Sequence, residues 1–279
     1  MAAGPPLTRL ALAAASVADD LGFVALTDLR TALGDEAGDY RIIGGHMVTV
    51  LAARWQLGAG LYRETGDADL GVPPVLVRDR DLTRRLKALG YRQVAGNRFA
   101  REVPDIPVRL AGGPAGDREA IIDVLVPAYT SRARQNVKVS EDLFSTEVPG
   151  LPTALSRPPV IIRLEMRRLN GEVLHAELPF PDEVSALVLK SLATRVRVKD
   201  TDVTDIWRCL EVAFAAQVAP AAFADGIRAE SAGIIRALFA SRSGPGMTAI
   251  AAGQGMTSQA ADVRYTRVRA LIARVLGPG

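Results

Sequence analysis

Two aspartates one residue apart, Asp67 and Asp69, are the residues of this sequence best suited to bind a metal ion. Side chains alternate between the two faces of a β-strand, so both carboxylates point the same way if this segment is extended. Carboxylate oxygens suit Mg²⁺, which takes its remaining ligands from water and from substrate phosphates. A glycine pair upstream, Gly44-Gly45, lets backbone N–H groups approach a phosphate closely. Together the two motifs indicate metal-assisted chemistry at a phosphate.

A third carboxylate, Asp123, lies in the apolar stretch 120–127 with isoleucine before it and valine after it. Burying a charge is costly unless the charge is paired or bound to a metal. Asp123 is therefore predicted either to complete the metal site or to form a salt bridge within the sheet.

The elements that must position these residues alternate between strands and helices. A short strand at 40–43 ends at the glycine pair, and a helix follows at about 46–57. The next strand, 67–72, carries the first two aspartates, and the buried strand 120–127 carries the third. A charged helix is expected at 79–89, ending at a glycine. This order predicts a mixed sheet with helices between its strands.

Other segments are less directly tied to the chemistry. The alanine-rich stretch 7–35 is predicted to form two amphipathic helices, and residues 98–101 and 108–110 are candidate strands. Residues 160–178 alternate apolar and charged side chains around Asn170-Gly171, which predicts a hairpin with a two-residue turn.

From residue 181 the pattern becomes helical. Asp182 is expected to open one helix and Asp202 the next, and two or three more helices fill 219–276. We therefore predict an α/β (α+β) fold. A mixed-sheet domain with N-terminal helices would span 1–180, and a helical domain 181–279.

Composition narrows the classes of protein. A single cysteine, Cys209, excludes an intrachain disulfide and fits a reducing cytoplasm, while two histidines are too few for a zinc site of the Cys/His type. No apolar run approaches the roughly 18 residues of a membrane span, so a cytoplasmic protein without membrane contact is expected. The net charge of +3 permits a polyanionic partner without requiring one.

Three groups of basic residues could serve such a partner. The groups are Arg78, Arg80, Arg84, Arg85 and Lys87; Arg163, Arg167 and Arg168; and Arg195, Arg197 and Lys199. Each could equally be an ordinary solvated face.

The order of the three aspartates and the glycine pair resembles the nucleotidyltransferase superfamily related to polymerase beta. In that superfamily a strand leads into Gly-Gly, the next strand carries a metal-binding Asp-x-Asp, and a later strand supplies a third carboxylate. The resemblance implies that Asp67 and Asp69 bind Mg²⁺ and that Asp123 is a further ligand or the base for the attacking hydroxyl. Two metals in such a site stabilise both the attacking and the leaving oxygens.

The helical half is similar to AbiEii-type nucleotidyltransferases, which include toxins of type IV toxin–antitoxin systems and the related MenT toxins. Lys190 precedes Asp202 by twelve residues and Asp205 by fifteen, like the lysine and later Asp-x-x-Asp of that family. The resemblance implies that Lys190 binds the triphosphate of an NTP and that Asp202 orients this lysine. It also implies an RNA acceptor, such as the 3′ end of tRNA, and a cognate antitoxin protein.

Six residues are predicted to contact the nucleotide. Arg63 and Thr65 precede the first carboxylates closely enough to bind phosphate or to brace the strand, and His46 follows the glycine pair. The predicted set is Gly44, Gly45, His46, Arg63, Thr65 and Asp205.

Two other functions remain open from the sequence. The same chemistry could serve a small-molecule acceptor, as in antibiotic nucleotidyltransferases, which the mild net charge allows. A non-catalytic interaction protein of the same fold is the other, favoured by His46 and by the long separation between Gly45 and Asp67. The intact carboxylates argue against it.

Overall fold

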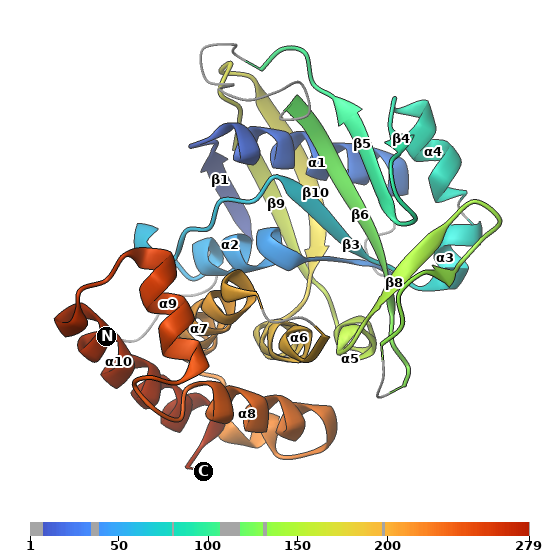
Figure 1. Cartoon of the computed structure of the whole chain (residues 1–279). Coiled ribbons are helices and arrows are strands. Elements are labelled where there is room, and N and C mark those ends of the chain that lie inside the picture. The colour runs from blue at the N-terminus through green and yellow to red at the C-terminus, as the bar shows by residue number, and fades with distance from the viewer. Residues whose placement is uncertain are drawn as a thin grey trace.

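The structure is a computed structural model that describes residues 8–34, 39–79, 81–106, 118–130, 133–196 and 199–278. Its α+β class with mixed sheets confirms the prediction (Figure 1). The candidate strand at 108–110 lies outside the described residues.

The main sheet is mixed and holds the predicted site strands. Its spatial order is β2-β3-β6-β5-β4, and β8 pairs with the end of β6 and with β7. The β3–β6 and β6–β8 pairs are parallel and the others antiparallel. The strands, in chain order, are β2 (Arg41–Ile43), β3 (Asp67–Gly71), β4 (Arg92–Gln93), β5 (Arg98–Glu102), β6 (Glu119–Pro127), β7 (Val137–Lys138) and β8 (Phe144–Val148).

A second sheet has the order β1-β9-β10, with strands β1 (Arg9–Ala13), β9 (Val160–Arg167) and β10 (Val173–Phe180). The antiparallel β9–β10 pair is the predicted hairpin. Its turn is one residue longer than predicted, because the Arg168 N–H donates to the Glu172 carbonyl, leaving residues 169–171 between them. Gly171 adopts φ +91°, which suits the last position of a three-residue hairpin loop.

The prediction of two helices for residues 7–35 is wrong. The structure has the strand β1 and then one long helix, α1 (Val17–Leu33), which the Ser16 hydroxyl caps by accepting from the Asp19 N–H. Alanine favours helix, but β1 pairs in parallel with β9 and buries Leu10, so sheet pairing overrides the local propensity.

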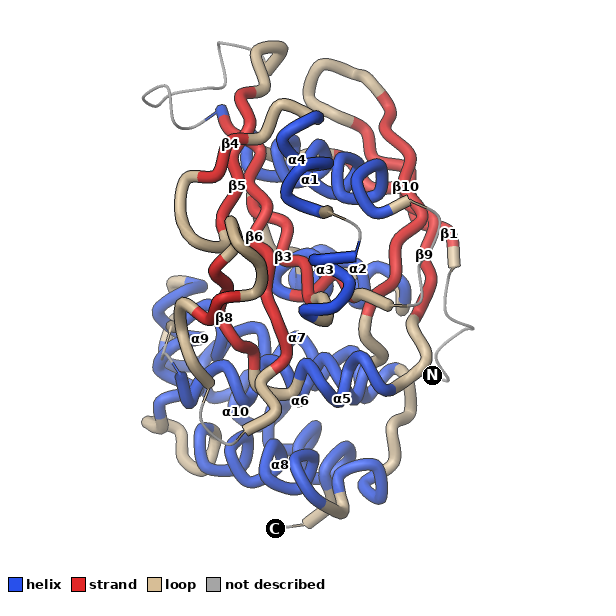
Figure 2. Tube along the Cα trace, turned by 90° about the vertical axis from the view of Figure 1, so that its right-hand side faces the viewer, coloured by secondary structure: helices blue, strands red, loops and turns tan. Residues whose placement is uncertain are grey.

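The helix α1 lies between the two sheets and contacts β3 and β6 on one side and β10 on the other (Figure 2). Helix α2 (Gly44–Arg54) follows β2 as predicted and also contacts strands of both sheets. Leu26 and Leu29 of α1 are fully buried, as expected for a helix covered on both faces. The main sheet is therefore buried on its α1 face.

The helix predicted at 79–89 is present as the shorter α4 (Leu82–Ala88), and a separate short helix that was not predicted, α3 (Pro74–Asp79), precedes it. Asp81 precedes α4 in a left-handed conformation at φ +47°, and its carboxylate accepts from the Arg84 N–H. The left-handed residue breaks the helix although the sequence pattern runs through it. The connection predicted between α2 and β3 contains the 3₁₀ turn η1 (Ala59–Leu61).

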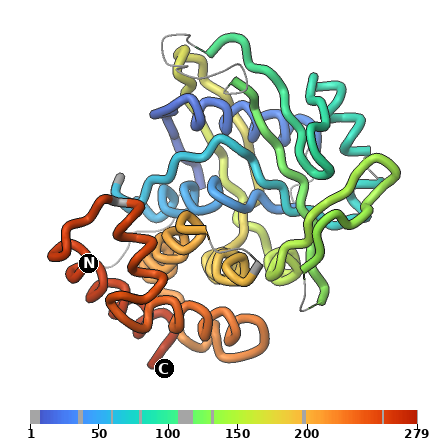
Figure 3. Tube along the Cα trace, viewed as in Figure 1, coloured from blue at the N-terminus to red at the C-terminus, as the bar shows by residue number. Residues whose placement is uncertain are grey.

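The chain after β10 is helical, and the predicted boundary at residue 180 coincides with the end of β10. These helices, gold to red in Figure 3, gather on the side of the molecule away from α1. The elements are α6 (Glu183–Val196), α7 (Asp200–Ala215), η3 (Pro220–Phe223), α8 (Gly226–Leu238), α9 (Pro245–Gln254) and α10 (Ser258–Leu276). No helix within the described ranges is long and apolar enough to cross a membrane.

Two helices of this half pack against the strand-containing part. Helix α7 contacts α2, and α6 contacts α7, α2 and the short helix α5 (Leu151–Ser156). Asp182 caps α6 as predicted, its Oδ1 accepting from the Ser185 N–H at 2.8 Å. Helix α7 begins at Asp200 instead of Asp202. This packing places the start of α7 and the middle of α6 next to the main sheet.

Candidate metal and phosphate site

The strand register brings the predicted site residues together. In the parallel β3–β6 pair Asp69 stands beside Asp123, and in the antiparallel β5–β6 pair Arg98 stands on the other side of Asp123. Asp67 lies two residues before Asp69 and so shares its face of the sheet. One row across three strands thus carries two carboxylates and an arginine.

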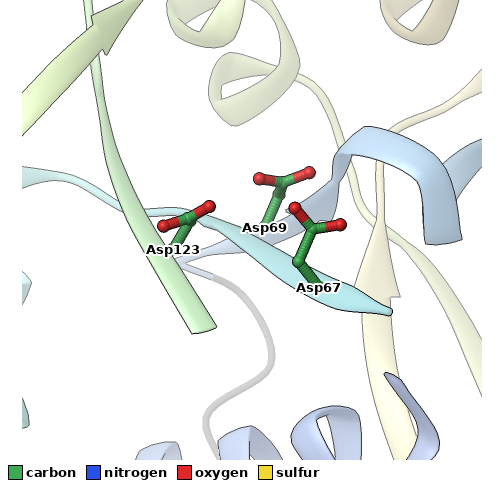
Figure 4. A group of neighbouring side chains, drawn as sticks. All are labelled: Asp67, Asp69 and Asp123. Carbon is green, nitrogen blue, oxygen red and sulfur yellow. The ribbon is translucent and has the colours of Figure 1, made fainter. Parts of the chain in front are cut away.

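The three aspartates form a compact cluster. One carboxylate oxygen of each of Asp67, Asp69 and Asp123 lies within 4.8 Å of the others. Figure 4 shows the three side chains on the same side of β3 and β6. The intervening Ala68 and Ile122 are fully buried on the opposite face, which fixes the direction of the carboxylates. An oxygen cluster of this size can hold a hard divalent cation.

Electrostatics within the cluster favour an added cation. Burial, together with the charges of Asp67 and Asp123, raises the pKa of the Asp69 carboxyl to about 7, while Lys190 and Arg63 act against the shift. Carboxylates this close cannot all be ionised without nearby positive charge. The donor set and its unbalanced charge therefore fit a metal ion.

The glycine pair lets the start of α2 lie against the carboxylates. Gly44 has φ +69°, and a Cβ at this position would overlap the Asp69 carboxylate. A Cβ on Gly45 would overlap the ends of the Arg63 and Thr65 side chains. Only glycine fits both positions, and the result is a helix N-terminus, with its partial positive charge, beside Asp69.

Lys190 is held in place by buried carboxylates of α7. Its Nζ lies 2.8 Å from Asp205 Oδ2 and 3.7 Å from Asp202 Oδ1. Asp205 is fully buried and also pairs with Arg63 at 3.0 Å and Arg208 at 2.9 Å. Asp205 is thus the closer partner of the lysine, and it ties α6, α7 and the segment before β3 together.

A cavity of about 510 Å³ opens in front of the carboxylates, between the main sheet and α6. Its volume lies in the range of small-molecule and cofactor pockets. The predicted residues among its lining are Gly44, Asp69, Asp123, Lys190 and Asp202. Residues that the sequence did not indicate line it too: Asn97, Arg98, Gln135, Asn136 and Thr146. Segments distant in sequence therefore meet in one site.

Three predicted nucleotide-binding residues, His46, Arg63 and Thr65, line a different cavity of about 440 Å³ between β1, α1 and α2. Burial lowers the pKa of His46 to about 4, so this imidazole is neutral at pH 7 and offers no charge to a phosphate. Thr65 Oγ1 donates to Asp67 Oδ1 at 3.3 Å. Of the two roles predicted for Arg63 and Thr65, these contacts favour bracing the strand.

Arg98 is the main site residue that sequence reasoning missed. Its Nε and Nη2 donate to the two oxygens of Asp123 at 2.9 and 2.6 Å, and Nη2 lies 3.8 Å from Asp67 Oδ2. The salt bridge predicted for Asp123 is therefore confirmed, and the same carboxylate also belongs to the three-aspartate cluster. The alternation of Arg98 with buried Phe99 could have indicated its face of the strand, but only the strand pairing reveals its partner.

Neither a protein-family model nor a curated protein sequence matches this chain. The geometry of the site is therefore the basis for its function.

Proposed function

We propose that the protein is a Mg²⁺-dependent nucleotidyltransferase, which moves a nucleoside monophosphate from an NTP to an acceptor hydroxyl and releases pyrophosphate. One observation carries the proposal: Asp69 and Asp123 of the three-aspartate cluster, the glycine-led start of α2 and Lys190 line one cavity. Each alone is common, but phosphate chemistry uses all three together.

Each group of residues would bind a different part of the substrate or the metal. Asp67, Asp69 and Asp123 would hold Mg²⁺, which when bound neutralises phosphate charge and stabilises the attacking and leaving oxygens. The start of α2 lines the same cavity through Gly44, and the N–H groups of its first turn can donate to phosphate oxygens. Lys190, fixed by Asp205, supplies a point charge to the triphosphate.

The resemblance to AbiEii-type enzymes supports an RNA acceptor, such as the 3′ end of tRNA, and with it a cytoplasmic toxin that an antitoxin inhibits.

A specific observation favours a small-molecule acceptor as the second candidate. Arginines in each predicted basic group are paired with acids, which lowers their attraction for a polyanion: Arg84 with Asp81, Arg163 with Glu177, Arg168 with Asp20, and Arg195 with Glu230. Arg80 and Arg197 lie outside the described residues.

A transfer assay tests the proposal. Purified protein is incubated with Mg²⁺ and each α-labelled NTP in turn, with total tRNA or a panel of aminoglycosides as acceptor. We expect label on one acceptor class with the wild-type protein and a loss of about 10³-fold or more in Asp69→Ala, since a metal ligand contributes several kcal/mol to the transition state.

Asp105→Ala is the matched control, because Asp105 is an ion-paired aspartate on a different cluster, bound to Arg168. It should retain activity. Equal activity in Asp69→Ala and wild type would overturn the metal assignment, and transfer to neither acceptor class would overturn the proposed reaction.

A further inference from the structure

Arg98 lies at the edge of the three-aspartate cluster and binds the carboxylate that a metal would use. Its guanidinium takes both oxygens of Asp123 in a fork and reaches toward Asp67. The contact follows from the register, since Arg98 and Asp123 are direct neighbours on β5 and β6. An internal cation therefore already partly neutralises this cluster.

In this arrangement Arg98 would compete with a metal ion for Asp123. A divalent cation bound through Asp123 would lie within a few ångströms of the guanidinium, where like charges repel strongly in a partly buried site. The bidentate contact also occupies one lone pair on each oxygen of Asp123, which leaves fewer sites for a metal. Metal binding is thus opposed as long as Arg98 stays on Asp123.

The Arg98 side chain also has room to move to a different partner. Its side chain is 43% exposed, in contrast to the 10% of the Asp123 side chain, so it can turn without disturbing the core. It lines the same cavity as Gly44 and Lys190. A guanidinium matches the geometry of phosphate oxygens as well as that of a carboxylate.

We propose that Arg98 exchanges partners during substrate binding, holding Asp123 in the free protein and the phosphates of the incoming nucleotide in the complex. The exchange frees Asp123 for the metal, so a bound triphosphate makes metal binding tighter than it is in the nucleotide-free protein. Arg98 is then both a positioning residue for Asp123 and a phosphate-binding residue. This inference rests on the proposed nucleotidyl transfer and adds the order in which its parts assemble.

Two equilibrium measurements on Arg98→Gln test the exchange without turnover. Mn²⁺ titration without nucleotide, followed by the electron paramagnetic resonance signal of free Mn²⁺, should show about tenfold tighter binding than wild type, because the competing cation is gone. Inorganic tripolyphosphate titrated in EDTA should bind about tenfold more weakly, because its cationic partner is gone.

Arg101→Gln is the matched control. Arg101 lies on the same strand and pairs with an aspartate, Asp28, but this contact involves α1 and not the cluster. Both affinities should equal those of wild type. Arg98→Lys, which keeps the charge and loses the fork, should bind Mn²⁺ nearly as weakly as wild type does.

An unchanged Mn²⁺ affinity or an unchanged tripolyphosphate affinity in folded Arg98→Gln would overturn the exchange. Asp69→Asn separates this failure from a failure of the proposed function. If Asp69→Asn loses Mn²⁺ while Arg98→Gln binds like wild type, only the exchange is wrong. If Asp69→Asn binds Mn²⁺ like wild type, the metal site itself is wrong.

Discussion

Two clusters in this molecule contain three carboxylates and one arginine, and they differ in where the arginine lies. In the first, Arg168 is nearly buried at the centre. It pairs with Asp20 at 2.6 Å, Asp105 at 2.5 Å and Glu172 at 2.8 Å. Every acid there shares the same guanidinium, and the cluster joins α1 to the β9–β10 hairpin.

In the second cluster the arginine is at the edge. Arg98 forms a close salt bridge with Asp123 and a longer one with Asp67. Asp69 forms no ion pair among the described residues. The three carboxylates face one another across less than 4.8 Å. Burial and mutual repulsion raise the pKa of Asp69, the group at their centre, to about 7.

The difference is the one expected between a structural cluster and a cluster that binds a ligand. The Arg168 cluster is complete within the protein, and its charges stabilise the fold. The Asp67–Asp69–Asp123 cluster stores unfavourable energy that a bound cation would relieve, which is the expected cost of a site prepared for a ligand.

Removing one acid from each cluster should have opposite effects on stability. Asp20→Asn should lower the free energy of unfolding by about 3 kcal/mol, because it leaves the buried Arg168 short of a charged partner. Asp69→Asn should not destabilise the metal-free protein. Urea denaturation in EDTA at pH 8 measures both, and a similar loss in the two variants would erase the distinction between the clusters.

The contributions of Asp69 and Asp105 to stability should also depend on pH with opposite sign. This effect should be smaller than that of the substitution at Asp20. The pKa of Asp69 is raised from 3.8 to about 7, so the folded protein binds more protons than the unfolded chain between these values. Stability from this group therefore falls as pH rises from about 4 to 7. The pKa of Asp105 is lowered by its hydrogen bonds to Arg168, so its contribution is present above pH 4 and lost as pH falls below that.

We accordingly expect metal-free Asp69→Asn to exceed wild type in stability by about 1–2 kcal/mol at pH 8, a value reduced for partial solvent exposure of this carboxylate. The advantage should shrink as pH falls from 7 to 4. Asp105→Asn should be less stable than wild type at pH 8, and its deficit should shrink only below pH 4. Denaturation curves across this pH range measure the stability of each variant minus that of wild type. The comparison would be contradicted if this difference rose for both variants, or fell for both, as the pH is lowered.

Much of the site could be predicted because it depends on local patterns. The spacing of Asp67 and Asp69 fixes their common face once β3 forms, and the apolar residues around Asp123 mark β6 as a buried strand. The glycine pair follows from the same logic, since the start of α2 leaves no room for a side chain at Gly44.

What could not be predicted depends on contacts between distant segments. Arg98 becomes important only through its register with Asp123, and Asp205 gains three cations from α6, α7 and the loop before β3. The strand β1 was missed for the same reason, because its pairing with β9 overrides the helical preference of alanine. Periodicity within one segment contains no information about such partners.

The most direct test of the central claim is the effect of Mn²⁺ on thermal stability at pH 8. A ligand that binds only the folded state stabilises it by about 2.7 kcal/mol at a concentration of 100 Kd. We predict that Mn²⁺ raises the Tm of wild type and of Asp20→Asn by several degrees and leaves that of Asp69→Asn unchanged. An equal rise in all three proteins, or none in wild type, would show that the three aspartates are not a metal site.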